Sequence, residues 1–256
     1  MKKALLFLLI SLAFTAISAQ EKVENPQKNV NQNVVLMVPS YTACGALGKL
    51  SNRYGFCNKI GFLMGYNIKN NWMIGVEGSY MFMGNVKETG ILESIATKRN
   101  GHINTNNFVG SVYLAGMGFD VKAVLGKFFS CSKKIPELGI QTQFGIGFLQ
   151  HQININVRQD LYPQLDKTYR KGYDRLTNGA VLSGFVGFSI LRPRKFINLY
   201  IGPTIDVAFT KNRRAINFDT GQKDNTNRVD ILLGAKFGFI IPIYKMAKSE
   251  NQEYQF

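Results

Sequence analysis

Apolar and polar side chains alternate with a period of two along residues 56–68 and again along residues 72–86. Successive side chains of a β-strand point to opposite faces, so this alternation predicts two strands. Large apolar residues occupy most of the even positions, and small, polar or charged residues occupy most of the odd ones. Residues 69–71, Lys-Asn-Asn, separate the strands as a turn, because asparagine tolerates the positive φ that hairpin turns need. The stretch therefore predicts a β-hairpin.

The length and chemistry of this hairpin favour a membrane barrel over a soluble sheet. Each strand has about 13 to 15 residues, whereas a usual strand has about five or six. The polar face carries charges inside the strands, at Lys59 and Glu77, and aromatic residues gather towards the strand ends. Transmembrane barrels have apolar outer faces, polar inner faces and aromatic girdles. A soluble β-sandwich is the alternative, because a half-buried sheet also alternates.

Six further segments show the same alternation, in whole or in part. They are residues 34–42, 108–125, 138–155, 180–191, 196–210 and 229–243. Pro39 interrupts the first, and segment 180–191 is so uniformly apolar that its facing stays open. The expected fold class is all-β, an eight-stranded antiparallel transmembrane β-barrel.

The connections between these strands alternate in length. Long ones, at 43–54, 87–107, 156–178 and 211–228, alternate with short ones at 69–71, 130–137 and 192–195. Bacterial barrels have short periplasmic turns and longer extracellular loops. Eight strands then place both termini on the periplasmic side of the outer membrane.

The N-terminus has the pattern of a secretory signal peptide. Lys2 and Lys3 precede an apolar core at residues 5–16, and Ala19 is the small residue expected before a cleavage site. Ile17 departs from the usual small residue two positions earlier, which leaves the cleavage position open. No later apolar run is long enough for a membrane helix. The expected organisation is a signal peptide (1–19), a flexible periplasmic leader (20–33), the outer-membrane barrel (34–245) and a periplasmic tail (246–256).

The charged residues inside the predicted barrel balance, although the chain as a whole carries a formal net charge of +15. The inward positions hold Lys59, Lys122 and Lys236 together with Glu77, Asp120 and Asp206. An eight-stranded barrel is just wide enough to be filled by its own side chains, and unpaired charges there are costly. We therefore expect an ion-pair network in a plugged lumen; an ion or proton path along these charges is the alternative.

The two last long loops are basic. The residues expected to contact an anion or a partner there are Arg158, Arg170, Lys171, Arg175, Arg213 and Arg214. Such loops suit lipopolysaccharide phosphates or an acidic protein partner, and a solvated loop surface is the equal alternative. Nucleic acid is not an expected ligand in this compartment.

Only a weak catalytic pattern is present. His151, Asp174 and Ser183 supply a base, an orienting acid and a nucleophile, but their spacing matches no known arrangement. The sequence contains no motif for a metal or a nucleotide cofactor. We expect a non-enzymatic protein without cofactor, and keep an outer-rim enzyme using His151 as an alternative.

The three cysteines allow two interpretations. Cys44 and Cys57 flank one predicted loop and form either a disulfide or a pair of small buried side chains. Cys131 lies alone in another loop, and an odd count does not indicate a disulfide framework.

Several stretches carry a family resemblance. They are IGFLMGYNIKNNWMIGVEGSYMF, GFLQH, KGYDRLTNG, NFDT and DILLGAKFGFIIPIYK. With them, residues 34–245 resemble the small outer-membrane β-barrel proteins of Bacteroidota that are often grouped as PorT-like. The resemblance implies an association with type IX secretion or with barrel assembly, and it brings no catalytic motif. Such barrels often end on an aromatic assembly signal, for which both Tyr244 and Phe256 qualify.

These observations predict an accessory or scaffold component of a secretion (type IX-like) or outer-membrane assembly complex. Its expected partners are outer-membrane lipid, lipopolysaccharide and other proteins of that complex. A small channel is a further alternative.

Overall fold

A computed structural model of the chain describes residues 34–96, 102–103, 109–110, 112–131, 135, 137–156, 162, 165–192 and 198–243. The expected signal peptide, leader and tail lie outside these residues. In the described part, no helix has the length and apolar character needed to cross a bilayer.

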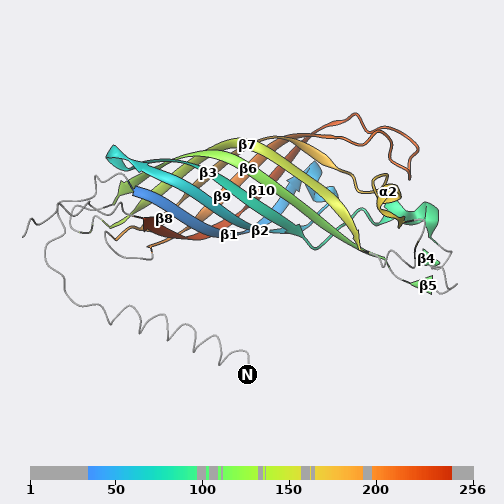
Figure 1. The fold of residues 1–256 in the computed structure, drawn as a ribbon, viewed down its shortest axis with the longest axis horizontal. Helices are drawn as coiled ribbons and strands as arrows, with labels where there is room; N and C mark the ends of the chain where they lie inside the picture. The colour runs from blue at the N-terminus through green and yellow to red at the C-terminus, as the bar shows by residue number, and fades with distance from the viewer. Residues whose placement is uncertain are drawn as a thin grey trace, which may run out of the picture. The chain divides into compact units, whose positions relative to one another are not determined.

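Eight long strands close into an antiparallel barrel, which confirms the expected fold class (Figure 1). The strands are β1 (Val34–Gly48), β2 (Phe56–Ile68), β3 (Trp72–Met83), β6 (Tyr113–Ser130), β7 (Leu138–Asn156), β8 (Thr177–Ile190), β9 (Asn198–Asn212) and β10 (Asn227–Ile243). Each pairs with its neighbour along the chain, and β1 pairs with β10 to close the ring. Closure leaves the barrel without a free edge strand.

The hairpin of β2 and β3 forms as its sequence predicts. Ile68 faces Trp72 in the ladder, and the turn between them has Asn70 at φ 65° and Asn71 at φ 62°. Large apolar side chains of both strands point outward; Ile60 exposes 58% and Val76 56% of its surface. Their alternate neighbours are mostly buried inside the barrel.

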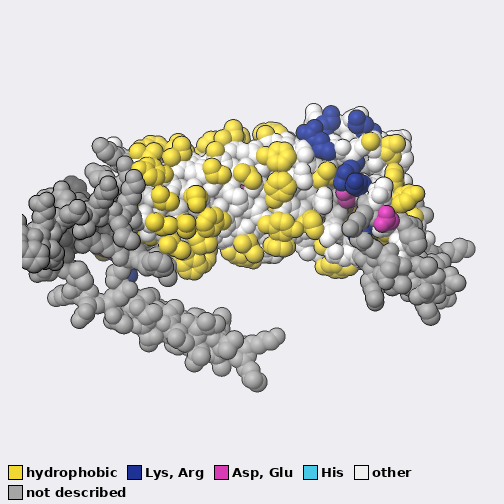
Figure 2. Space-filling view, viewed as in Figure 1, with side chains coloured by type: hydrophobic (Ala, Val, Ile, Leu, Met, Phe, Trp, Pro, Cys, Tyr) yellow, Lys and Arg dark blue, Asp and Glu magenta, His cyan; other side chains and the backbone are white. Residues whose placement is uncertain are grey.

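The same two-sided pattern runs round the whole barrel, and Figure 2 shows apolar side chains spread along its surface. It also settles the facing of β8, which the sequence left open. Leu182, Val186 and Phe188 point outward, and Val181 and Phe185 are buried inside.

The first strand is longer than predicted, because Pro39 does not end it. Pairing with β2 continues through Pro39, which faces Phe62, and β1 runs on to Gly48. On the other side the pairing with β10 stops after Met37 and resumes at Ser40. Proline has no N–H to donate, so it interrupts one ladder and leaves the other intact.

The fourth long strand begins later than predicted. It starts at Tyr113, not at residue 108, since β5 (Val109–Gly110) pairs with β4 (His102–Ile103) in a separate two-stranded sheet. The preceding connection is not a featureless polar loop either. It contains the 3₁₀-helix η3 (Thr89–Ile95), whose Ile91 and Leu92 are buried in the apolar core.

The connections after β2, β6 and β8 lie at one end of the barrel, and those after β1, β3, β7 and β9 lie at the other. The predicted alternation in length fails once: β1 extends to Gly48, so the connection 49–55, expected to be long at 43–54, is no longer than 131–137 or 191–197. The end with the β2–β3 turn is called the short-turn end here, and the other is the long-loop end. The long-loop end carries η1 (Lys49–Asn52), η3 and the helix α2 (Lys167–Arg170). The two remaining short turns fall largely outside the described residues.

Candidate functional site

The lumen contains a layer of six charged side chains, which we call the lumen layer. Its members are Lys59, Glu77, Asp120, Lys122, Asp206 and Lys236. None of them exposes more than 5% of its surface. The inward phase of the strand alternation places all six there, and their formal charges sum to zero.

Four of these side chains form a ring of alternating charge. The Nζ atom of Lys59 lies 2.5 Å from Asp206 and 2.9 Å from Asp120. The Nζ atom of Lys122 lies 3.2 Å from Asp120 and 3.5 Å from Asp206. Each carboxylate therefore contacts two ammonium groups, so neither faces the dry interior alone.

The remaining two members form a separate pair across the lumen. Lys236 on β10 donates to Oε1 of Glu77 on β3 at 2.6 Å. In the strand ladder, however, Glu77 faces Lys122 on the adjacent strand. The bond to Lys236 reaches past two intervening strands, which is possible because the interior of an eight-stranded barrel is narrow.

Buried apolar side chains lie on both sides of the lumen layer. Towards the short-turn end the buried cluster comprises Val38, Leu63, Met73, Val124, Phe185, Tyr200 and Ile240. Towards the long-loop end a larger cluster includes Leu149, Ile153, Val181 and Leu232. The charges thus lie between two apolar layers, where low polarity strengthens their attraction.

His151 does not join the pattern that its sequence suggested. Its Nε2 atom lies 3.2 Å from Asp230, which also accepts a hydrogen bond from Thr210 at 2.5 Å. Asp174 instead pairs with Arg214. Ser183 faces Gly145, six residues from His151 along β7.

Asp230, the partner of His151, was not among the inward charges that the sequence predicted. It lies six residues before Lys236 on β10 and therefore points to the same side of the sheet. Strand parity alone was a sufficient signal to place Asp230 inside the barrel.

A second group of ion pairs, the rim cluster, lies at the long-loop end. It consists of Arg53, Glu88, Asp174, Arg175, Arg214 and Asp219. Glu88 lies 3.2 Å from Arg53 and 3.5 Å from Arg175, and Arg175 also binds Asp219 at 2.5 Å. Burial opposes the charge of Arg175, but the hydrogen bonds and attraction of Asp219 raise its pKa above the ordinary value.

The basic loop residues expected to contact ligands have mixed surroundings. Arg175 and Arg214 are engaged in the rim cluster, and Arg170 donates to the carbonyls of Leu165 and Ile155. Arg213 donates to the side-chain oxygen of Asn178 at 2.6 Å, and Lys171 is exposed. Arg158 lies outside the described residues.

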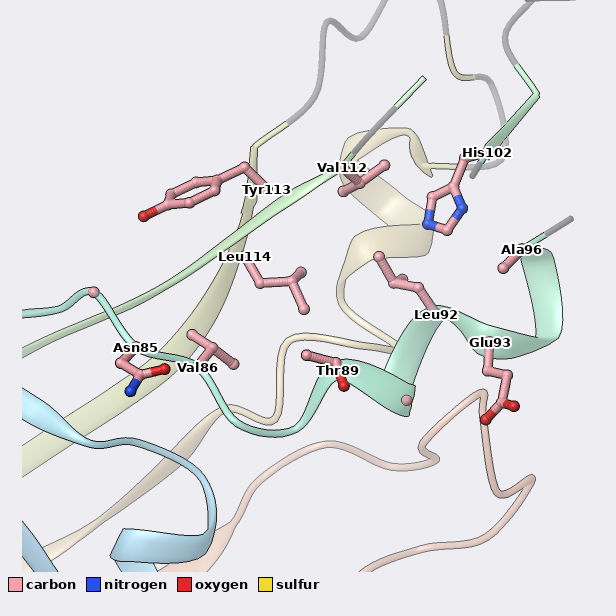
Figure 3. Close-up of a pocket in the computed structure, with 12 residues that line it drawn as sticks. Asn85, Val86, Thr89, Leu92, Glu93, Ala96, His102, Val112, Tyr113 and Leu114 are labelled. Atoms are coloured by element: carbon pink, nitrogen blue, oxygen red, sulfur yellow. The ribbon is translucent and has the colours of Figure 1, made fainter. Parts of the chain in front are cut away.

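A pocket of about 510 Å³ lies at the long-loop end, between η3 and the start of β6 (Figure 3). Leu92, Val112 and Leu114 give it an apolar lining, to which Glu93 and His102 add polar groups. The Nδ1 atom of His102 is buried and has no hydrogen-bond partner among the residues that the structure describes, and burial lowers the pKa of its imidazole. Among the described residues, no cluster of His, Cys, Asp and Glu has the arrangement of a metal site.

Cys44 and Cys57 face each other directly across β1 and β2, so the sequence was right that they can meet. Both are buried free thiols, and the disulfide interpretation is therefore not realised. Cys131 is also free, and it is exposed.

No protein-family model matches the chain, and no curated protein matches it. Among solved structures, it is similar to the N-terminal β-barrel domain of Pseudomonas aeruginosa OprF, with 10% identity, 82% of this chain and 100% of that chain covered, and a TM-score of 0.39. It is also similar to two structures of Ail, the attachment invasion locus protein of Yersinia pestis, with 82% of this chain and 100% of that chain covered in both. The structure in complex with the heparin analogue sucrose octasulfate has 10% identity and a TM-score of 0.35, and the structure whose name gives no ligand has 12% identity and a TM-score of 0.34. The strand ladder of the chain itself defines the class: a closed, eight-stranded antiparallel β-barrel.

Proposed function

We propose that the chain is an integral protein of the bacterial outer membrane and a non-enzymatic accessory or scaffold subunit of a secretion or outer-membrane assembly complex. The PorT-like resemblance makes a type IX-like secretion complex the first candidate. The observation that carries the proposal is a lumen sealed by paired charges between two apolar layers. A barrel whose described interior is filled by paired charges and apolar side chains is expected to work through its surface and loops.

The barrel exterior supports the membrane placement. Its outward rows are apolar on every strand, with Phe144 and Ile201 each exposing 56% of their surface. Soluble monomers rarely expose apolar patches of more than a few hundred Å², whereas lipid covers such a belt in a membrane barrel. Short periplasmic turns and long extracellular loops then orient the chain.

The interior argues against the alternatives of channel and rim enzyme. A conducting path requires continuous hydrated space, and here two apolar layers enclose the lumen layer. A rim enzyme would need a nucleophile beside His151, whose partners are Asp230 and the ring of Tyr54. Ser183 lies elsewhere on the barrel wall.

The long-loop end supports binding of an anionic partner. Figure 2 shows Lys and Arg side chains gathered there, beyond the apolar belt. Lys171 and Lys223 are exposed and have no ion pair among the described residues. Positive loops of this kind attract acidic protein surfaces and lipopolysaccharide phosphates.

Affinity purification from native membranes tests the proposal. The tagged chain is solubilised in mild detergent at native expression level, and co-purifying proteins are identified by mass spectrometry. We expect a complex larger than the barrel. Lys171→Glu with Lys223→Glu should weaken it, and Lys87→Gln, whose ammonium group donates to the carbonyl of Ser51, should leave it unchanged. Recovery of the wild-type chain as a free monomer overturns the scaffold role.

A further inference from the structure

A groove of about 690 Å³ runs over the outer face of the barrel wall. It follows a row of directly facing residues across five strands. The row is Leu125 on β6, Phe144 on β7, Gly184 on β8, Ile205 on β9 and Leu233 on β10. Gly184 has no side chain and leaves the middle of the row low, while the other four members are large and apolar.

One end of the groove holds a cation. The Nζ atom of Lys127 lies 4.6 Å from the centroid of the Trp72 ring and 5.2 Å from that of Phe129. Among the described residues, no carboxylate lies within ion-pair distance of Lys127. The two rings hold the ammonium group by cation–π attraction and leave its charge without an anion.

The groove rises from this cation into the apolar belt. Lys59 binds both Asp120 on β6 and Asp206 on β9, so these two carboxylates lie at one level. Ile205, beside Asp206, is therefore at the level of the lumen layer. Lys127 lies seven residues from Asp120 towards the short-turn end, which corresponds to about 17 Å along the barrel axis at usual strand rise and tilt. That rise is comparable with one leaflet of a hydrocarbon core about 30 Å thick.

We propose that this groove is a binding site for one anionic phospholipid of the periplasmic leaflet. Its phosphate pairs with Lys127 beside Trp72, and one acyl chain lies along the groove over Gly184 towards Ile205. The lipid is oriented in this way because the cation lies at the end of the groove nearer the short turns, and the apolar row leads away from that cation. The site rests on the membrane placement and orientation proposed above.

Trp72 gives this site its own reporter, because it is the single tryptophan of the chain. Lipids brominated near the headgroup end of an acyl chain quench tryptophan fluorescence on contact. The whole chain is reconstituted in phosphatidylcholine vesicles with a minor fraction of brominated phosphatidylglycerol, or with the same fraction of brominated phosphatidylcholine. We expect about fivefold greater occupancy beside Trp72 for the anionic lipid, which corresponds to about 1 kcal/mol for one lysine near anionic headgroups.

Two variants separate the parts of the site. Lys127→Gln removes the charge and should make the two lipids quench equally, whereas Lys87→Gln, in the loops, should keep the preference. Gly184→Leu fills the groove, since a Cβ there meets only Ile205 at an ordinary 3.5 Å, and should abolish the preference. Its matched control is Gly78→Leu, another outward strand glycine, whose added Cβ meets nothing within 4 Å.

Equal quenching by both lipids in the wild-type chain overturns the site. A preference that survives Gly184→Leu but not Lys127→Gln overturns the assignment of the groove. Vesicles made entirely of brominated phosphatidylcholine distinguish these results from a failure of the membrane placement. Strong quenching there keeps Trp72 at the lipid surface, and its absence contradicts the proposed function itself.

Discussion

The lumen layer and the rim cluster contain the same chemical groups in different surroundings. In the lumen layer, three lysines and three carboxylates balance, and none exposes more than 5% of its surface. In the rim cluster, the side chain of Glu88 exposes 30% and that of Arg214 23%. The lumen layer uses lysine and bonds across the barrel, whereas the rim cluster uses arginine and bonds between loops.

The difference in burial gives the two groups different tasks. Water reaches the rim cluster at Glu88 and Arg214, so the pairs of these two side chains contribute less to stability than the pairs of the lumen layer, although Arg53 and Arg175 are themselves buried. The lumen charges have no such solvent, and each depends on its partner to remain ionised inside the barrel. The lumen layer thus holds the strands together, and the rim cluster orders loops that remain open to a ligand.

The largest effect is expected for Asp206→Ala. This change removes the carboxylate shared by Lys59 and Lys122 and leaves buried positive charge uncompensated. We expect the free energy of unfolding to fall by about 3–5 kcal/mol. The measurement is a urea titration of the detergent-folded barrel, whose midpoint is the urea concentration at which the compact gel mobility is lost. Asp166→Ala, at an exposed loop carboxylate, is the control, and equal midpoints for the two variants contradict the role of the lumen layer.

A double-mutant cycle on Glu77 and Lys236 tests whether the buried charges of the lumen layer depend on their partners. Glu77→Met or Lys236→Met alone leaves one buried charge without its partner and should lower the free energy of unfolding by about 3 kcal/mol. The double variant removes both charges and should unfold within about 1 kcal/mol of wild type, because an apolar pair of similar size fills the same space. Additive losses in the same urea assay speak against a paired charge at this position.

A smaller effect is expected in the rim cluster. Asp219→Ala removes the bidentate partner of Arg175, whose guanidinium keeps Glu88 as a second carboxylate partner. We expect a cost of about 1 kcal/mol, with faster hydrogen exchange at residues 171–176 and unchanged exchange in the strands. A loss as large as that of Asp206→Ala would erase the contrast between the two groups.

A nearly neutral change completes the series. Arg192 and Glu137 form an ion pair at 3.4 Å near the short-turn end, with side chains 40% and 36% exposed. Arg192→Ala should therefore alter the unfolding free energy by about 0.5 kcal/mol or less. A measured loss above about 2 kcal/mol would show that exposure does not set the strength of these pairs.

Acidification should affect the long-loop end before the lumen. Burial holds the pKa of His102 below its ordinary value of 6.5, so the folded loop favours the neutral imidazole. The corresponding stabilisation is complete above pH 6.5 and decreases as the pH falls below it, since the unfolded loop binds the proton more readily. Hydrogen exchange around η3 should accelerate at pH 5 in wild type and less so in His102→Gln. Identical profiles contradict the burial of His102.

Strand parity predicted much of this molecule. It placed all six members of the lumen layer inside and gave the β2–β3 turn its residues, because both depend on a local period of two. It could not tell that Glu77 bonds to Lys236 while facing Lys122, since that choice depends on how the closed barrel staggers its strands.

The loops were less accessible to the same reasoning. Asp174 looked like a partner for His151 from its place in the sequence, yet it pairs with Arg214, forty residues further along the chain. Loops have no side-chain period, and their contacts form only when distant segments meet at one end of the barrel. Gly184 had no visible role until its neighbours in the strand ladder were known.

Electrical recording on the purified chain tests the sealed lumen most directly. The wild-type barrel is inserted into a planar lipid bilayer at neutral pH, and insertion is verified by protease protection of the strands. The paired charges between two apolar layers predict a bilayer that stays silent across the accessible voltage range. Reproducible stepwise conductance by the inserted wild-type chain would contradict the account.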